Sequence, residues 1–483
     1  MDTPAQNGNL YKNCLSSSYG IYVQKPADNN NHAIQITDST EPLALCLLAI
    51  HTNFSVPILM SLIEIIKQEN FKFASQHSPV ASPDTQKLVS DIIRRVINDK
   101  DQAIIDMTRE FDKVSPEHLR VPDKAISDAE ATMDSVTKSI LSEAIESIRA
   151  FHKNQIQESW TRTANDGTRL GEIVTPLDRV GVYVPGGTAF YPSSMIMNAV
   201  PAQLADVPSI VVASPPGANG LPHQLVLGIC SMLGIDEVYA FGGAQAVAAL
   251  AYGTDSIQAV CKITGPGNKY VAEAKRQVYG QVGIDSIAGP SEILILHDVP
   301  DVPIEFLVRD MISQAEHDEE ATSILITTIP EVAQAVQKRL DELVPTLPRK
   351  DIIEASLKHN GKIILVDTID RGIEISNRIA PEHLELLLAD ESQIEQITNA
   401  GAIFMGPCSS EPVGDYMAGP NHTIPTSGAA KFSSPLSVRD FQKHSSLIHY
   451  SKKRLLAQGE NIAKFADMEE LSGHAAAIRV RLK

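Results

Sequence analysis

Two copies of the tetrapeptide PEHL place a carboxylate beside an imidazole, at Glu117-His118 and at Glu382-His383. Such a pair can share acid–base chemistry where burial and coupling bring both pKa values towards neutrality. The first copy is flanked by charged residues and prolines, a composition typical of an exposed turn between helices. The second leads into an apolar run at 384–388, which places its pair where a loop meets a core strand. Local sequence favours the second copy without deciding the matter.

Side chains that could hold a metal ion lie in three separate segments. Gln314 and His317 are three residues apart near the end of an expected helix, so they share one face and could grip one ion. Asp415 and His422 lie in a turn rich in glycine and proline, and His474 stands at an expected helix start. Nitrogen and oxygen donors of this kind suit zinc or a similar divalent ion. Each residue could equally be a solvated helix end, a helix cap or part of an ordinary turn.

Three glycine-rich turns, "VYVPGGTAF", "VYAFGGAQAVAALAYG" and "KITGPGNKYVAEAK", each run from an apolar strand into a helix. Free amide groups and the helix dipole at such a junction favour an anionic or polar ligand. None of the turns is a GxGxxG fingerprint or a Walker loop, and one of them alone would be read as a tight turn. Together they favour a ligand site, because open α/β sheets bind ligands at the carboxyl ends of their strands.

The elements that must position these residues follow from the hydrophobic pattern. Residues 82–152 have a helical period, with Leu88, Ile92, Ile93 and Val96 expected on one face. Short apolar strands then alternate with helical stretches, which predicts an α/β fold with largely parallel sheets and two α/β domains. The strands are expected at 179–184, 209–214, 237–241, 293–298, 323–328, 361–367 and 401–406. The final 45 or so residues read as helical and amphipathic.

Composition narrows the class of protein. The chain has 483 residues, of which 43% are hydrophobic and 21% charged, as expected for a globular protein with more than one packed unit. A formal charge of -18 argues against nucleic-acid binding, although a local pocket could still take a nucleotide. The five cysteines are odd in number and never form a CxxC pair, which indicates a reducing compartment, and we expect a cytoplasmic protein.

The first 61 residues differ from the rest, being polar, irregular and free of arginine. We expect a poorly ordered leader there. No residue from Pro42 to Ile63 is charged, but His51, Asn53 and Pro57 interrupt that run and make a lipid-facing helix costly. We therefore expect no membrane span.

Long blocks of the sequence, in order, resemble the histidinol dehydrogenase family over about residues 62–483. The blocks are "GVYVPGGTAFYPSSMIMNAVPAQLA", "GGAQAVAALAYG", "TGPGNKYVAEAKRQVYGQVGIDSIAGPSE", "SQAEHDEEA", "RIAPEHLELLL", "GDYMAGPNHTIPTSGAAKFSSPLSV" and "SGHAAAIRV". The resemblance implies NAD-dependent oxidation of L-histidinol through L-histidinal to L-histidine, the last step of histidine biosynthesis, with two NAD used in succession. It also implies two incomplete Rossmann-like domains with a helical N-terminal segment and an extended C-terminal tail.

The resemblance assigns roles to particular residues. It implies zinc ligands at Gln314, His317, Asp415 and His474, and a homodimer in which His474 and Glu469 reach the neighbouring site. Glu382 and His383 are implied to be catalytic: His383 takes the alcohol proton, and Glu382 activates the water that attacks the aldehyde. The implied substrate contacts are Ser291, Gln314, His317, His383, Asp415, Glu469 and His474. The implied NAD contacts are Tyr183, Gln245 and Asn268, one in each glycine-rich turn.

The corresponding division of the chain is a leader at 1–61, a catalytic and metal domain from 62–182 and 291–435, an NAD-binding domain at 183–290 and a dimerisation tail at 436–483. Two other functions fit the same scaffold. A related zinc dehydrogenase would oxidise a different polar alcohol, and a non-catalytic homologue would bind NAD or metal without turnover. The second would be favoured by a replaced acid–base residue, and none is replaced.

Overall fold

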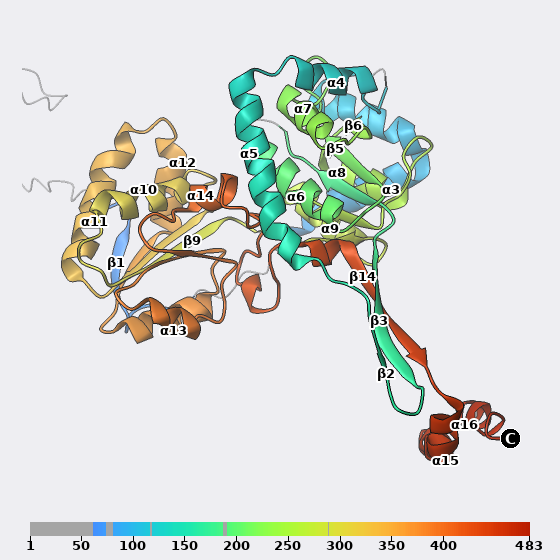
Figure 1. Cartoon of the computed structure of the whole chain (residues 1–483). Helices are drawn as coiled ribbons and strands as arrows, with labels where there is room; N and C mark the ends of the chain where they lie inside the picture. The colour runs from blue at the N-terminus through green and yellow to red at the C-terminus, as the bar shows by residue number, and fades with distance from the viewer. Residues whose placement is uncertain (1–60, 74–80, 116–117, 187–190, 288) are drawn as a thin grey trace, which may run out of the picture. The chain divides into compact units, whose positions relative to one another are not determined.

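The computed structural model describes residues 61–483 except 74–80, 116–117, 187–190 and 288. The leader expected at 1–61 therefore lies almost entirely outside the described residues. In the described part of the chain, no helix combines the length and apolar character needed to cross a membrane. The two predicted α/β units are both present, and each is built on its own parallel sheet (Figure 1).

One sheet has six parallel strands in the order β1-β11-β10-β9-β12-β13. Alternate side chains of a strand point to opposite faces, so Ile293 and Ile295 of β9 join one core while Leu294 and Leu296 join the other. Helices α10, α11 and α12 cover the first face, and α13 covers the second. The elements are β1 (Glu64–Lys67), β9 (Glu292–His297), β10 (Thr322–Thr327), β11 (Lys362–Leu365), β12 (His383–Leu387), β13 (Ala402–Met405), α10 (Ile304–Ala315), α11 (Pro330–Leu343), α12 (Lys350–His359) and α13 (Ile369–Ile379).

The other parallel sheet has five strands in the order β6-β5-β4-β7-β8, which is 3-2-1-4-5 in chain order and matches a Rossmann-like unit. Helices α4 to α7 pack on one face, and α3, α8 and α9 pack on the other. The elements are β4 (Val180–Tyr183), β5 (Ile210–Ser214), β6 (Val238–Ala240), β7 (Lys262–Thr264), β8 (Gly283–Ile284), α3 (Pro83–Met107), α4 (Asp123–Ala131), α5 (Ser135–His152), α6 (Pro192–Leu204), α7 (Gln224–Met232), α8 (Gly243–Tyr252) and α9 (Lys269–Val278).

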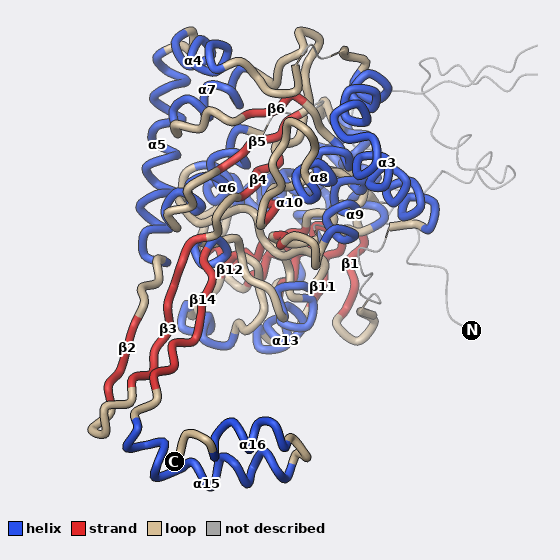
Figure 2. The backbone as a smooth tube through the Cα atoms, turned by 90° about the vertical axis from the view of Figure 1, so that its right-hand side faces the viewer, coloured by secondary structure: helices blue, strands red, loops and turns tan. Residues whose placement is uncertain are grey.

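Three antiparallel strands, β2 (Trp160–Thr163), β3 (Arg169–Pro176) and β14 (Gln442–His449), form a ribbon that leads to helices α15 (Lys452–Met468) and α16 (Ser472–Arg479). Figures 1 and 2 show these two helices at the far end of the ribbon, away from both parallel sheets. The hydroxyl of Thr168 in the β2–β3 turn accepts from the Ser451 backbone N–H at 3.2 Å, which ties the start of α15 to the ribbon.

The remaining elements are short. They are a π-helical turn η1 (Thr108–Asp112), the 3-10 turns η2 (Lys153–Gln155), η3 (Val344–Thr346), η4 (Glu391–Gln396), η5 (Ala429–Lys431) and η6 (Val438–Phe441), and the short helix α14 (Glu411–Tyr416).

Three features differ from the sequence-based expectations. Leu88 is 47% exposed, and Val89 takes its place on the buried face of α3. Residues 442–449 form strand β14, because they can pair with β3 along their whole length, whereas the tail had been expected to be helical. Helices α3, α4 and α5 pack on the five-stranded sheet, although residues 62–182 had been grouped with the other unit. Their apolar faces pack in the same two cores as those of α6 to α9. Hydrophobic periodicity within one segment does not show which sheet a helix will pack against.

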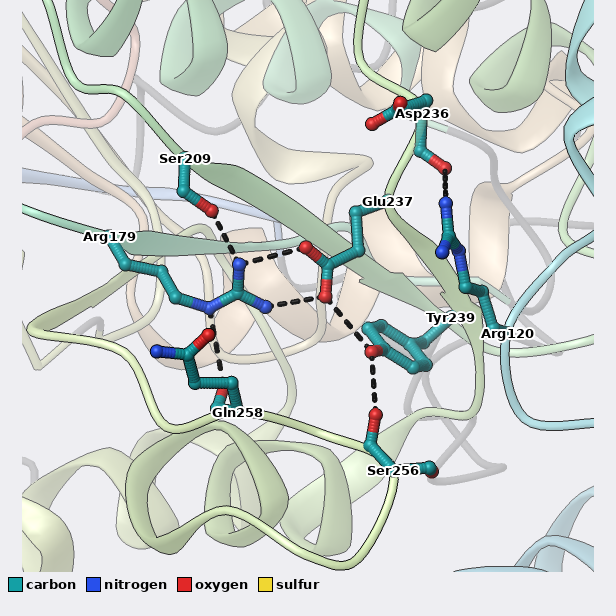
Figure 3. Close-up of polar contacts among 8 residues, drawn as sticks. All are labelled: Arg120, Arg179, Ser209, Asp236, Glu237, Tyr239, Ser256 and Gln258. Carbon is teal, nitrogen blue, oxygen red and sulfur yellow. Dashed lines mark hydrogen bonds and ion pairs between the residues drawn. The ribbon is translucent and has the colours of Figure 1, made fainter.

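An ion-pair network joins the amino ends of β4, β5 and β6 (Figure 3). Arg179 precedes β4 and donates from Nη1 to Glu237 Oε2 at 2.8 Å, and it also contacts the Ser209 hydroxyl before β5. The Tyr239 hydroxyl lies 2.9 Å from Glu237 Oε1 and 3.1 Å from the Ser256 carbonyl oxygen. Hydrogen bonding from Arg179 lowers the pKa of Glu237. This network fixes strand register at the edge opposite the glycine-rich turns.

Glu237→Gln is expected to lower the free energy of unfolding by about 2–4 kcal/mol, since it leaves a nearly buried guanidinium without its counter-charge. Kinetic constants should stay within about twofold, because the network lies at the other edge of the sheet. Thermal unfolding followed by circular dichroism measures the loss. Arg120→Ala is the matched control: Arg120 is exposed, its guanidinium contacts Asp123 and the Asp236 carbonyl oxygen, and it acts on Glu237 through its charge without a hydrogen bond, so the change should cost less than about 1 kcal/mol. Equal losses for both variants would contradict this role of Glu237.

Candidate active site

Glu382 and His383 stand at the amino edge of the six-stranded sheet, where β12 begins beside β9. The Glu292 backbone N–H donates to Glu382 Oε2 at 2.8 Å, and the Glu292 carbonyl oxygen lies 3.0 Å from His383 Nδ1. A carbonyl oxygen only accepts, so Nδ1 carries the hydrogen and Nε2 keeps its lone pair. Ser291 directly precedes β9 and is half-buried beside this pair. One residue of β9 therefore orients both members of the second PEHL pair.

Burial sets the charge of this pair. His383 is 5% exposed, and burial lowers the pKa of its imidazole to about 4, with a contribution from the neighbouring His317 and His422. Burial also raises the pKa of Glu382 well above its ordinary value, and the charges of Glu292, Glu411 and Asp415 raise it further. At neutral pH the imidazole is therefore uncharged and able to accept a proton.

A group of potential metal ligands lies next to this pair. His317, Glu411 and Asp415 each offer one donor atom, and these atoms lie within 4.8 Å of one another. His317 Nε2 and Glu411 Oε1 are 3.8 Å apart. Gln314 lies one turn before His317 at the end of α10, and both polar atoms of its buried amide lack a hydrogen-bond partner. The structure thus brings Gln314, His317 and Asp415 of the predicted ligand set to one place.

The electrostatics of this group fit a cation. Burial and mutual repulsion raise the pKa of Glu411 well above its ordinary value, and burial raises that of Asp415. Burial likewise raises the pKa of Glu292 to about 7. In addition, Glu411 Oε2 is buried without a hydrogen-bond partner. Several carboxylates packed together with unused donor atoms are stabilised by a bound divalent ion, and the mixed nitrogen and oxygen set suits zinc.

Sequence reasoning missed Glu411 and gave His422 only a local role. Glu411 precedes Asp415 by four residues on α14, and this spacing places both carboxylates on one helix face. This i, i+4 pair of carboxylates is the sequence feature that could have indicated Glu411 as a metal ligand. His422 is close enough to His383 to affect its pKa, and its Nε2 is buried without a hydrogen-bond partner.

Two predicted site residues and the first PEHL copy lie elsewhere. His474 on α16 and Glu469 at the end of α15 are exposed at the far end of the ribbon (Figure 1). In the first PEHL copy, residues 116–117 lie outside the described residues, and His118 is exposed. His118 therefore has no part in the group formed around His383.

The three predicted cofactor contacts line a single cavity of about 820 Å³ at the carboxyl edge of the five-stranded sheet. They are Tyr183 at the end of β4, Gln245 in the first turn of α8, and Asn268 before α9. The Tyr183 hydroxyl accepts from the Gly243 backbone N–H at 3.1 Å, so two glycine-rich turns are joined directly. A cavity of this size at the carboxyl ends of parallel strands is typical of a nucleotide site.

A buried ion pair holds the third glycine-rich turn. Lys275 pairs with Asp285, and both side chains are 3% exposed. Lys275 Nζ donates to the Gly265 carbonyl oxygen at 3.1 Å, while the Gly265 N–H donates to Asp285 Oδ2 at 2.8 Å. Gly265 has a φ of +114°, and a Cβ there would lie 2.0 Å from the Tyr183 carbonyl oxygen, so only glycine fits. The pair thereby fixes the turn that carries Asn268.

A loop at 419–427 connects the two halves of the site. Asn421 Nδ2 donates to the Met197 carbonyl oxygen of α6 at 2.6 Å, and Thr426 Oγ1 accepts from the Gly289 N–H at 2.6 Å. The loop is thus hydrogen-bonded both to α6, on the five-stranded sheet, and to the segment that leads into β9 of the six-stranded sheet. A neutral buried imidazole able to accept a proton and a nucleotide-sized cavity on a Rossmann-like sheet are the features expected of an α/β dehydrogenase.

Comparisons with known proteins narrow this class. Residues 75–482 match the family described as histidinol dehydrogenase. Histidinol dehydrogenase from Halalkalibacterium halodurans is 49% identical over 399 residues, covering 82% of this chain and 94% of the relative, and that from Bacillus subtilis is 48% identical over 397 residues, covering 82% and 93%. The crystal structure of histidinol dehydrogenase from Elizabethkingia anophelis has a TM-score of 0.82 and 34% identity, covering 87% of this chain and 98% of that one. The chain belongs to the histidinol dehydrogenase family and is an oxidoreductase.

Proposed function

We propose that this protein oxidises L-histidinol to L-histidinal and then to L-histidine, passing one hydride to NAD in each step. The observation that carries the proposal is the orientation of His383, whose Nδ1 is held by the Glu292 carbonyl oxygen while Nε2 keeps a lone pair. Membership of the histidinol dehydrogenase family supports the choice of substrate. Tyr183, Gln245 and Asn268 around one cavity support NAD as the hydride acceptor.

His383 and Glu382 take successive roles in the proposed reaction. In the first step His383 Nε2 accepts the alcohol proton as hydride leaves the carbon, which yields the aldehyde and one NADH. In the second step Glu382 takes a proton from the water that adds to the aldehyde. The hydrate, as its singly deprotonated form, then gives its hydride to a second NAD, and the carboxylic acid so formed releases its proton to solvent as the carboxylate. Both residues are hydrogen-bonded to the backbone of Glu292, which supports successive proton transfers at one substrate carbon.

Gln314, His317 and Asp415 would hold a zinc ion, and its positive charge would counter the raised pKa of Glu382. When bound, zinc would orient the substrate through the substrate's amino and imidazole nitrogens. Ser291 directly precedes Glu292 at the start of β9, and we assign it to the same substrate site. The fourth ligand, His474, is exposed far along the ribbon, so we assign it to the site of a second copy of the chain (Figure 1).

The surface of the C-terminal helices supports a homodimer. Large apolar side chains on α15 and just beyond α16 are exposed: Phe465 by 66%, Met468 by 78% and Val480 by 62%. Ile448 of β14 is 71% exposed beside them along the chain. An apolar face of this kind is typical of a protein interface. A second copy seated on it would bring Glu469 and His474 to the neighbouring catalytic pair.

The protein is proposed to work in the cytoplasm. Cys230, Cys261 and Cys408, the cysteines within the described residues, form no disulfide, which suits a reducing compartment.

The decisive experiment measures NADH formed per L-histidinol consumed, before and after chelation and after zinc is added back. Two NADH per substrate, histidine as product, loss on chelation and recovery with zinc are expected. One NADH per substrate would remove the second step from the proposal. Turnover of another polar alcohol in place of histidinol would assign a different substrate to the same site.

The pH dependence of kcat/KM for histidinol follows from the state of His383. Burial lowers the pKa of His383 to about 4, so the imidazole is neutral above that pH and protonated below it. The first hydride transfer, which uses His383 and not Glu382 as its base, is therefore expected to be lost as the pH falls through about 4, and not near 6.5 where an exposed histidine titrates. Initial rates between about pH 3.5 and 8 in short assays test this. An acid limb centred near 6.5 would place the base in an exposed position.

A further inference from the structure

The walls of the cofactor cavity carry an unusual charge pattern. Among the described residues that line it, Asp112 is the carboxylate, and none is lysine or arginine. His223 also lines the cavity, and burial lowers the pKa of its imidazole, so near neutral pH a nucleotide bound here meets one negative side chain and no cationic one from these residues. Its phosphates would rely on backbone N–H groups at the start of α8.

Asp112 is placed for contact with a ligand. It ends the π-helical turn η1, and the following residue, Lys113, has a left-handed φ of 59°. Turns of this kind inside or at the end of α-helices are frequent at functional sites. Asp112 Oδ2 is buried and has no hydrogen-bond partner in the described structure. Lys113 does not neutralise it, because its Nζ donates to the Glu110 carbonyl oxygen at 2.7 Å.

The Tyr183 hydroxyl lies in the field of this carboxylate. Burial raises the pKa of Tyr183 to about 12, and the charge of Asp112 adds to that rise. Tyr183 accepts from the Gly243 N–H, which leaves its own hydroxyl hydrogen available. The two side chains thus offer an acceptor and a donor on one side of the cavity, an arrangement that suits the vicinal hydroxyls of a ribose.

The topology indicates which ribose this is. In a Rossmann unit, a carboxylate after the second strand accepts a hydrogen bond from the 2′-hydroxyl of the adenosine ribose. Here the second strand is β5, and Ser214, Pro215 and Pro216 at its end line the cavity without supplying an acid. Asp112 reaches the cavity from η1, which follows α3 and lies outside the sheet. It is the carboxylate among the described residues that line the cavity.

We propose that Asp112 accepts hydrogen bonds from the adenosine ribose hydroxyls of the cofactor and so selects NAD over its 2′-phosphorylated form. A 2′-phosphate would face a carboxylate in a partly buried site with no cation from the lining residues, and like charges repel strongly there. The inference rests on the proposed function, since it takes NAD as the hydride acceptor.

Asp112→Asn and Asp112→Ala test the inference, with Asp106→Asn as the matched control. Asp106 lies outside the cavity on α3, which leads into η1, and pairs with Arg95 and Arg109. Calorimetry with AMP should show binding weakened about 10- to 100-fold in both Asp112 variants and unchanged in the control, the effect of losing a hydrogen bond to a charged group. The ratio of kcat/KM with NAD to that with NADP should fall by a similar factor in both Asp112 variants and stay unchanged in the control.

Unchanged AMP affinity in both variants, with unchanged thermal unfolding, would overturn the assignment. So would an equal loss of kcat/KM with NAD and NADP, because it would show general binding without discrimination. The AMP measurement needs no histidinol. Failure of the wild-type protein to oxidise histidinol would therefore count against the proposed function alone.

Discussion

His383→Asn is expected to lower kcat for L-histidinol oxidation by about 100- to 10,000-fold, the usual contribution of a general base. Asparagine keeps a side-chain donor that can reach the Glu292 carbonyl oxygen, but it has no lone pair equivalent to Nε2. The alcohol proton would then have no acceptor at the moment of hydride transfer. Stopped-flow absorbance of NADH in a single turnover measures this step directly.

The chain supplies its own control for this experiment. His118 occupies the same tetrapeptide but is exposed, so His118→Asn should leave kcat and KM within about twofold. Zinc content, measured by atomic absorption, should be the same in both variants. Single-turnover rates that remain equal in His383→Asn and His118→Asn would remove His383 from the proton transfer.

Mixing two inactive subunits should restore activity if His474 belongs to the neighbouring site. His383→Asn removes the base of its own subunit, and His474→Asn removes a metal ligand from the partner's site. A mixed dimer then contains one site with both defects and one site with neither. With random pairing, half of the dimers are mixed, so roughly a quarter of all sites become intact.

Co-expression of the two variants with different affinity tags allows the mixed dimer to be purified and assayed. Each variant alone should have less than about 1% of wild-type kcat, whereas the purified mixed dimer should have about half. A mixed dimer as inactive as its parents would place His474 in the site of its own subunit. A fully active His474→Asn homodimer would remove His474 from the site.

Much of the fold could be predicted because parallel strands buried on both faces read as continuous apolar runs. The seven strands expected from 179 to 406 all form, and the run after the second PEHL becomes β12. Strand β14 could not be recognised, because six of its eight residues are exposed and give no strand signal of their own. Its pairing with β3, far earlier in the chain, is a long-range property.

The site was predictable in part for related reasons. Gln314 and His317 share a helix, and each glycine-rich turn ends a strand, so local spacing indicated them. The approach of α14 to the end of α10 is a tertiary contact, and it brings Glu411 and Asp415 to His317. Asp112 likewise enters the cavity from a turn that follows a long amphipathic helix. Nothing in the local sequence distinguishes such a residue from a carboxylate on the surface.

The two parallel sheets present opposite edges to the site, and this sorts its ligands by charge. The cofactor cavity lies at the amino end of α8 and beside Asn268 at the start of α9, where peptide dipoles are positive and suit phosphate groups. Gln314 and His317 lie at the carboxyl end of α10, where the dipoles are negative and suit a cation. The backbone at these helix ends therefore favours phosphate groups on the cofactor side and a cation beside Gln314 and His317, before any side chain contributes.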